Sequence, residues 1–227
     1  MISEKIFDFL AALAANNNRE WFSDNKIRYT EARQEFEHFV ANFIEMIGEI
    51  DPTIGKPTVK ETIFRINRDI RFSNDKRPYK QNFGCYVAQG GRKSILPGYY
   101  IQFEPGATFF GGGIYCPQAD VLKKVRNEIA VFPEDLSAIL EKPSFKKTFG
   151  DLWPDQLKTA PKGFPKDHVA IELLKYKSYT ATCNFTDEQC MAQGFENDLR
   201  AAISNLRPLN DFLLRAIEAP EEEKIEF

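Results

Sequence analysis

Apolar residues at helical spacing mark the start of the chain. The first stripe consists of Ile6, Phe9, Leu10 and Leu13, and its spacing predicts a short amphipathic helix. The run Asn16–Asn18 ends this pattern, because asparagine side chains compete for backbone hydrogen bonds and favour turns. Asn17 and Glu20 have the spacing of a capping box, so we expect a second helix to begin near Arg19 and to end at Asp51-Pro52.

The second helix carries a repeat of apolar residues at intervals of seven. Its members are Phe22, Tyr29, Phe36, Phe43 and Ile50, with Ala32, Phe39 and Met46 three positions further on. A coiled-coil seam prefers Leu, Ile or Val, whereas this seam is mainly aromatic. The pattern therefore favours packing on a globular core, with a dimer seam as the alternative.

The middle of the chain changes to short β-like runs separated by turn residues. The predicted strands are Thr58–Ile66, Phe83–Ala88, Tyr99–Glu104, Thr108–Ile114 and, later, Tyr179–Phe185. Turns at Gln89–Arg92 and Glu104–Gly106 join neighbouring strands. Short strands joined by tight turns indicate an antiparallel sheet. Gly111–Gly113 matches no phosphate-binding glycine motif, so a strand kink or a close backbone approach is expected there.

Helical patterns return after this sheet. The expected helices begin near Val121, span Pro133–Leu140 and Asp167–Tyr176, and close the chain over Glu196–Ile217 with an interruption at Pro208. A Pro- and Lys-rich connection is expected from Lys142 to Lys166. The predicted fold class is α+β, with an antiparallel meander sheet packed against N-terminal and C-terminal helices. No internal repeat or long linker divides the chain, so residues 1–227 are predicted to form a single domain.

Composition narrows the function without naming one. The 227 residues are 43% hydrophobic and carry a net charge of −3, as in ordinary globular proteins. No apolar run is long enough to span a membrane, and the N-terminus lacks the pattern of a signal peptide, so no membrane association and a cytoplasmic location are expected. Four cysteines without CxxC spacing and two distant histidines predict neither a metal site nor a cofactor.

The charge distribution is uneven. The segment Lys56–Lys93 contains ten basic and three acidic residues, a local charge of +7 in a chain of net −3. A basic segment on an acidic protein indicates a local anionic partner and argues against broad nucleic-acid binding.

Arginines dominate the centre of this segment, which we interpret as a strand over Ile63–Ser73. Alternate residues from Phe64 to Phe72 are apolar except Arg68, which would therefore point into an apolar layer. A guanidinium group in that position needs a carboxylate, several carbonyls or a bound anion. The opposite face carries Asp69 with arginines on either side of it.

The arginine-rich segment resembles the signature of a known protein family. The pattern Arg65-x-x-Arg68-Asp69-x-Arg71-Phe72-x-x-x-Lys76-x-x-Tyr79 resembles the signature of a widespread bacterial family, with fungal relatives, catalogued as a domain of unknown function. Two further blocks are similar to that family: Asn17–Phe22 with Lys26 and Tyr29, and Pro161–Phe164 with Asp167-His168. The resemblance implies a conserved hypothetical protein of this length, and it implies no reaction, cofactor or catalytic residue.

Three functions stay open. The first is binding of a small phosphorylated or carboxylated ligand, because arginine matches the geometry of both anions and Tyr79 offers a stacking surface. The predicted ligand-binding residues are Arg65, Arg68, Arg71, Lys76, Tyr79 and Lys80. If the protein is an enzyme, Asp69 and His168 are the candidate proton-transfer groups.

The second hypothesis is a non-enzymatic interaction or structural module, in which the Arg–Asp motif is an internal salt-bridge network. The third, less favoured, is a single-stranded nucleic-acid binder. The sequence does not predict the oligomeric state.

Overall fold

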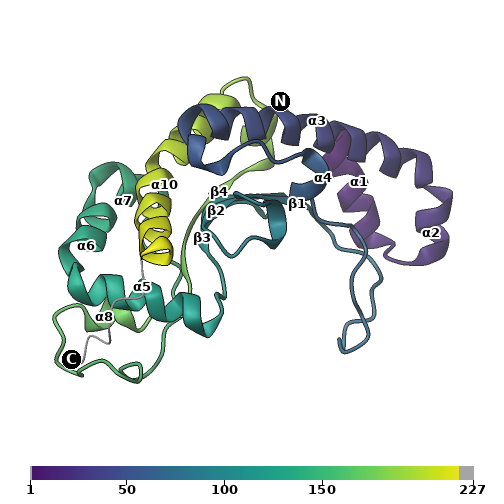
Figure 1. Ribbon diagram of the computed structural model, residues 1–227. Helices are drawn as coiled ribbons and strands as arrows, with labels where there is room; N and C mark the ends of the chain where they lie inside the picture. The colour runs from purple at the N-terminus through teal and green to yellow at the C-terminus, as the bar shows by residue number, and fades with distance from the viewer. Residues whose placement is uncertain (1, 220–227) are drawn as a thin grey trace. The chain divides into compact units, whose positions relative to one another are not determined.

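The structure is a computed structural model that describes residues 2–219 (Figure 1). The chain divides into two compact units. Within the described residues, unit 1 comprises residues 2–93, 99–110 and 184–201, and unit 2 comprises residues 94–98, 111–183 and 202–219. The expectation of one domain stays a prediction.

The elements confirm the α+β class. The α-helices are α1 (Glu4–Ala15), α2 (Arg19–Asp24), α3 (Lys26–Ile50), α4 (Val59–Thr62), α5 (Ala119–Val131), α6 (Pro133–Glu141), α7 (Pro143–Phe149), α8 (Ile171–Leu174), α9 (Asp187–Met191) and α10 (Phe195–Glu218). Two short 3-10 helices are η1 (Pro52–Ile54) and η2 (Gly91–Lys93). The strands are β1 (Phe83–Val87), β2 (Gly98–Phe103), β3 (Thr108–Ile114) and β4 (Tyr179–Phe185).

The four strands form one sheet in the order β1-β2-β3-β4, as expected for a meander. The antiparallel register of β1 on β2 pairs Phe83 with Phe103 and Val87 with Tyr99. Each of the four strands lies within a residue or two of its predicted bounds.

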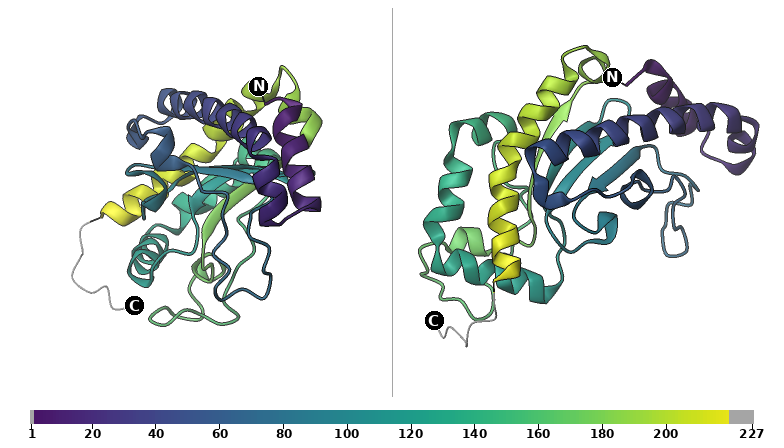
Figure 2. Two further views of the ribbon diagram at one scale, coloured as in Figure 1. Left: turned by 90° about the vertical axis from the view of Figure 1, so that its right-hand side faces the viewer. Right: turned by 45° about the horizontal axis from the view of Figure 1, so that its top comes forward.

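Aromatic packing builds the core of unit 1. Phe36 of α3 is fully buried and stacks on Phe83 of β1, with ring centroids 5.3 Å apart. Phe9 of α1 stacks on the same Phe83 ring at 6.1 Å. Figure 2 shows α1 and α2 at one end of the long helix α3. The apolar seam of α3 is thus largely buried within this unit, which is the core-packing interpretation of its heptad repeat.

In unit 2, polar side chains tie helices to neighbouring segments. Arg126 of α5 donates to the carbonyls of Leu174 and Tyr176 at 2.8 and 3.0 Å. Arg215 of α10 forms ion pairs with Glu128 and Asp135 at 2.7 and 2.6 Å. These contacts fix α5, α6 and α10 around the apolar residues that they bury.

The glycine run in β3 marks a close backbone approach, as predicted. A Cβ atom on Gly111 would lie 2.6 Å from the carbonyl oxygen of Ala181 in β4. A Cβ atom on Gly112 would overlap the carbonyl oxygen of Gly98. Gly113 has a φ of +100°, which favours glycine.

Several helix boundaries differ from the sequence predictions. Asn18, not Asn17, caps α2, because its side-chain oxygen accepts a hydrogen bond from the Trp21 N–H at 2.9 Å. The predicted long helix is broken at Asn25, whose side chain donates to the Trp21 carbonyl. Pro208 lies inside an unbroken α10.

Two connections toward the C-terminus also differ. The segment predicted as a connection from residue 142 contains α7, and the predicted helix 167–176 shortens to α8.

The predicted strands 58–66 and 63–73 are wrong. Thr58 and Glu61 form a capping box that starts α4, with the Glu61 carboxylate 2.7 Å from the Thr58 N–H. Residues 63–80 then form an irregular loop, which we call the basic loop because it carries six Lys or Arg residues and two Asp residues. The loop folds back on itself, but Pro78 has no N–H to donate, so no continuous ladder forms.

Candidate functional site

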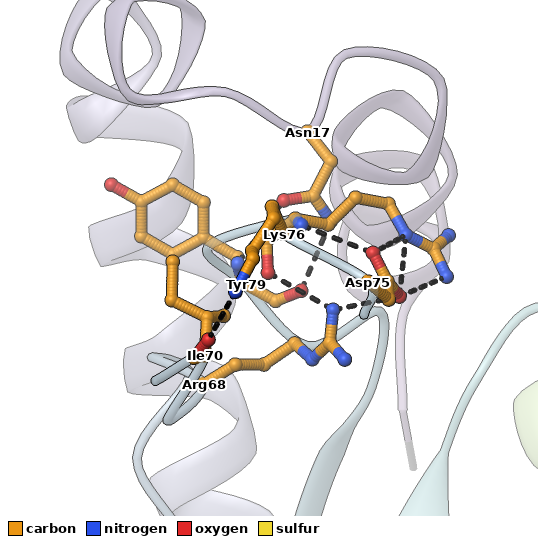
Figure 3. A network of polar contacts seen from close by, with 7 residues as sticks. Asn17, Arg68, Ile70, Asp75, Lys76 and Tyr79 are labelled. Atoms are coloured by element: carbon orange, nitrogen blue, oxygen red, sulfur yellow. Dashed lines mark hydrogen bonds and ion pairs between the residues drawn. The ribbon is translucent and has the colours of Figure 1, made fainter. Parts of the chain in front are cut away.

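The basic loop is anchored at its base by backbone hydrogen bonds. The Arg68 N–H donates to the Pro78 carbonyl at 2.9 Å, and the Lys80 N–H donates to the Ile66 carbonyl at 2.8 Å. Asn17 adds a two-way clamp, accepting from the Tyr79 N–H at 3.1 Å and donating to the Tyr79 carbonyl at 3.0 Å. The Asn17 segment and the arginine signature, 62 residues apart, therefore meet in space (Figure 3).

An ion-pair network holds the two limbs of the loop together. Asp75 accepts from Arg68 at 2.8 Å and from Arg77 at 2.7 Å. Arg68 also donates to the Arg77 carbonyl at 3.0 Å. Hydrogen bonds from Arg77, with a smaller contribution from Arg68, lower the pKa of Asp75 well below its usual range. Arg68 thus has the carboxylate that its sequence position requires, although its side chain is 25% exposed and is not sealed in an apolar layer.

The tip of the loop repeats this pairing in a more exposed setting. Arg71 makes two hydrogen bonds to Asp69, at 2.9 and 2.6 Å, which lower the pKa of the Asp69 carboxyl. Lys76 donates to the Ile70 carbonyl at 3.2 Å. Phe72 is 95% exposed, so the apolar alternation expected for this segment ends before it.

Two predicted cations have no carboxylate partner. Among residues 2–219, the side chains of Arg65 and Lys80 form no ion pair. The Lys80 ammonium lies 5.1 Å from the Phe64 ring centroid. Burial, and then the positive charge of Arg65, lower the pKa of Lys80. An anion near this pair would relieve their mutual repulsion.

A pocket opens where α2, the start of α3 and the basic loop converge in unit 1. Its volume is about 360 Å³, within the range of small-molecule sites. The lining residues are Arg19, Phe22, Ser23, Lys26, Tyr29, Ile66, Asn67 and Tyr79. We call it the aromatic pocket.

Three rings form the wall of the aromatic pocket. Tyr79 stacks on Phe22 with centroids 4.0 Å apart and planes 15° apart. Tyr29 lies 4.9 Å from Phe22. The Lys26 ammonium sits 4.8 Å from the Tyr29 centroid and 5.3 Å from the Phe22 centroid, in cation–π range of both rings. In Figure 3 the Tyr79 ring points away from the Arg68 and Asp75 side chains, so the ion-pair network and the pocket occupy different sides of the loop.

The charge lining the pocket is entirely positive. Arg19 and Lys26 are exposed and form no ion pair within the described residues. No Asp or Glu is among the lining residues. Two cations beside an aromatic wall provide a binding surface for an anion that carries an apolar or planar group.

The predicted ligand-binding residues coincide only in part with the residues that line the aromatic pocket. Of the six predicted ligand-binding residues, Tyr79 lines the aromatic pocket. Arg68 and Arg71 are engaged with aspartates, and Lys76 with a carbonyl. Arg65 and Lys80 lie together at the base of the loop.

The candidate proton-transfer groups belong to different units. Asp69 is in unit 1, where its lowered pKa makes it a weak base near neutral pH. His168 is in unit 2, where its Nδ1 accepts a hydrogen bond from the Ala170 N–H at 3.0 Å. That bond lies in the turn that leads into α8, and a catalytic role for either residue stays a prediction.

The pocket residues Arg19, Ser23, Lys26 and Asn67 had no predicted role. The sequence does carry a signal for four of the lining residues, because Arg19, Phe22, Lys26 and Tyr29 belong to the Asn17 block of the family resemblance. Their proximity to Tyr79 depends on the Asn17 clamp, which no local pattern reveals.

The described residues show neither a metal-binding cluster nor a membrane-spanning helix. No cluster of three or more His, Cys, Asp or Glu side chains among residues 2–219 is arranged to hold a metal ion. None of the helices in that range combines the length and apolarity that a membrane span needs.

The fold and the pocket define an α+β protein with a cationic, aromatic-walled cavity beside a basic loop. Comparison with protein families matches residues 5–212 to the family described as "Conserved hypothetical protein (DUF2461)", and the chain belongs to that family. A search of curated proteins finds no match, and a search of solved structures finds none either.

Proposed function

We propose that the protein binds a small anionic ligand, phosphorylated or carboxylated, in the aromatic pocket. The observation that carries this proposal is the pair Arg19 and Lys26, which line the pocket without a carboxylate partner in the described chain. An unneutralised pair of cations beside a concave surface attracts and orients an anion.

In this proposal the basic loop forms the side of the pocket that faces α2 and the start of α3. Asn17 fixes the backbone of Tyr79, and Phe22 fixes its ring, so Tyr79 is preorganised before a ligand arrives. Arg65 and Lys80 extend the positive potential along the base of the loop. Binding is the step proposed here, and the predicted proton-transfer groups Asp69 and His168 are not among the lining residues.

Isothermal titration with a panel of small phosphates, nucleotides and dicarboxylates tests the proposal. At least one anion should bind at low salt, and Lys26→Ala should raise its Kd by about tenfold or more, as expected for a lost charge-assisted hydrogen bond. Arg28→Ala is the matched control, because Arg28 is an exposed cation two residues along α3 and does not line the pocket.

Equal loss of affinity in both variants would show a general electrostatic effect and would contradict a specific site. Absence of binding by every anion in the panel would contradict the proposal itself.

A second function is favoured by a separate observation. Arg68, Arg71 and Arg77 are all paired with loop aspartates, which fits a structural or interaction module whose signature maintains the loop conformation. If the protein is such a module, Arg68→Ala lowers the free energy of unfolding, and no small anion binds to the protein. Binding of a small anion that is lost in Lys26→Ala decides between the two functions.

The proposed setting is the bacterial cytoplasm. The four cysteines are all free thiols, as is usual where thiols are kept reduced. Nucleic acid is the less favoured partner, because the chain as a whole is acidic.

A further inference from the structure

We infer that the ligand of the aromatic pocket is an aryl phosphate monoester, bound as the dianion. This inference rests on the proposed function, and it selects one member of the broader class of anions considered there. Three features of the pocket carry it: its charge, its neutral hydrogen-bonding groups and its aromatic wall.

The charge of the pocket matches a dianion. Arg19 and Lys26 are both without a carboxylate partner among residues 2–219, and no acidic residue lines the pocket to offset either of them. A carboxylate or a sulfate ester neutralises one of the two cations. A phosphate monoester carries a charge of about −1.5 to −2 near neutral pH and neutralises both.

The neutral polar groups match a ligand with several acceptor oxygens. Ser23, Tyr29, Asn67 and Tyr79 line the pocket, and their side chains form no hydrogen bond within residues 2–219. Three of the four are hydroxyl groups and the fourth is an amide, and all can donate. A phosphate group has three terminal oxygens, each of which accepts more than one hydrogen bond, so it can use donors that a planar carboxylate leaves unpaired.

The aromatic wall selects the organic part of the ligand. Phe22 and Tyr79 form a rigid stacked pair, and Tyr29 adds a third ring 4.9 Å from Phe22. Ile66 lies in the same wall, and because Ile66, Phe22 and Tyr79 are buried, the half-buried Tyr29 is the most accessible ring. Lys26 lies over two of these rings, so an anion that reaches its ammonium group is next to the wall. A ring joined to phosphorus through one oxygen places a planar group against the wall and its charge beside Lys26.

The experiment compares ligands that differ in one property. Phenyl phosphate, phenyl sulfate, benzoate and inorganic phosphate are titrated into the full chain at pH 8 and low salt. Phenyl phosphate should bind most tightly. Phenyl sulfate has the same ring and nearly the same shape but one negative charge, and its Kd should be at least tenfold higher. Inorganic phosphate, which lacks the ring, should also bind at least tenfold more weakly.

Variants assign the effect to the pocket. Arg19→Ala and Lys26→Ala should each raise the Kd for phenyl phosphate by about tenfold or more and should reduce the preference over phenyl sulfate. Lys26→Arg keeps the charge and should retain most of that preference, and Arg28→Ala should change nothing. Thermal melting of each variant confirms that it is folded, which is expected because Arg19, Lys26 and Arg28 are exposed.

The outcomes separate this inference from the proposed function. Equal affinity for phenyl phosphate, phenyl sulfate and benzoate would overturn the phosphate dianion while leaving anion binding intact. Equal affinity for phenyl phosphate and inorganic phosphate would overturn the aryl group. If no anion binds, or if Arg28→Ala weakens binding as much as Lys26→Ala, both the inference and the proposed function fail.

Discussion

Strand β1 and the basic loop are neighbours in the chain, but different interactions hold them in place. β1 pairs with β2 over five consecutive residues and buries Phe83 beneath α1 and α3. The basic loop has a few backbone bonds at its base, and above them its limbs are joined by ion pairs centred on Asp75. Burial therefore determines the geometry of the first region, while charge and a few polar contacts determine that of the second.

This difference between the two regions explains why the pocket forms beside the loop and not on the strand. A strand buried on both faces offers no free surface for a ligand, whereas a loop held by polar contacts exposes one side to solvent. Tyr79 lies at the boundary, with its backbone clamped by Asn17 and its ring stacked on Phe22. The pocket thus joins a rigid aromatic wall to a polar, accessible rim.

The largest expected effect comes from breaking the buried region. Phe36→Ala removes a fully buried ring that stacks on Phe83 and meets Phe103 edge-on. We expect a loss of about 3–5 kcal/mol in the free energy of unfolding, since a large ring leaves a cavity in a packed core. Urea denaturation measures it. A loss below about 1 kcal/mol would contradict the assignment of α3 as a core helix of unit 1.

An intermediate effect is expected where the two regions meet. Asn17→Ala removes both hydrogen bonds to the Tyr79 backbone and should lower the free energy of unfolding by about 1–3 kcal/mol, from about 0.5–1.5 kcal/mol for each bond. Urea denaturation again measures it.

The matched control is Asn18→Ala, which removes a helix cap instead and should cost about 1 kcal/mol. Only Asn17→Ala should also weaken ligand binding, because it alone frees Tyr79. Loss of binding in both variants would show that α2 as a whole, and not the Asn17 clamp, positions the pocket.

The sequence predicted the first region far better than the second. The strands 83–88, 99–104 and 108–114 follow from local residue types and turn residues, and β1, β2 and β3 confirm them. Residues 63–73 also have the pattern of a strand, but a strand needs a continuous partner. Only single bridges form, from Ile63 to Cys85 and from Asn67 to Tyr79, and Pro78 has no N–H with which to extend the second.

Local patterns could not reveal the pocket. The capping signal at Asn17 was misassigned, because Asn18 makes the cap and Asn17 bonds to a residue 62 positions away. A contact of that range depends on how α2 and the basic loop pack, and not on spacing along the chain. The arginine signature does predict a pairing of Arg71 with Asp69, two residues away, whereas the pairing of Arg68 with Asp75 depends on how the loop folds back.

At acidic pH the basic loop should lose stability, because the carboxylate of Asp75 becomes protonated. Its pKa is lowered in the folded protein, so the stability that it provides is present above the unfolded carboxyl pKa, about 3.9, and is lost as the pH falls below that value. Asp75→Asn should therefore reduce the decline in thermal stability between pH 4 and pH 2, at the expense of stability at pH 7.

Asp8→Asn provides the comparison, because Asp8 is an exposed carboxylate of α1 without an ion pair among residues 2–219. An unchanged acid profile in Asp75→Asn would mean that the ion pairs of the loop contribute nothing measurable, as is common for exposed pairs.

The smallest effect should come from Phe72, which sharpens the comparison because it is the same residue type as Phe36. Phe72 is 95% exposed, and within residues 2–219 the contact of its ring is with the Arg71 guanidinium at 5.8 Å, near the limit of a cation–π interaction. Phe72→Ala should change the free energy of unfolding by less than about 0.5 kcal/mol, measured by urea denaturation beside Phe36→Ala. It should also leave the Kd of a pocket ligand unchanged, since Phe72 does not line the pocket. A loss comparable to that of Phe36→Ala would mean that the loop tip is buried in solution, and the contrast between a packed region and a charge-held loop would no longer stand.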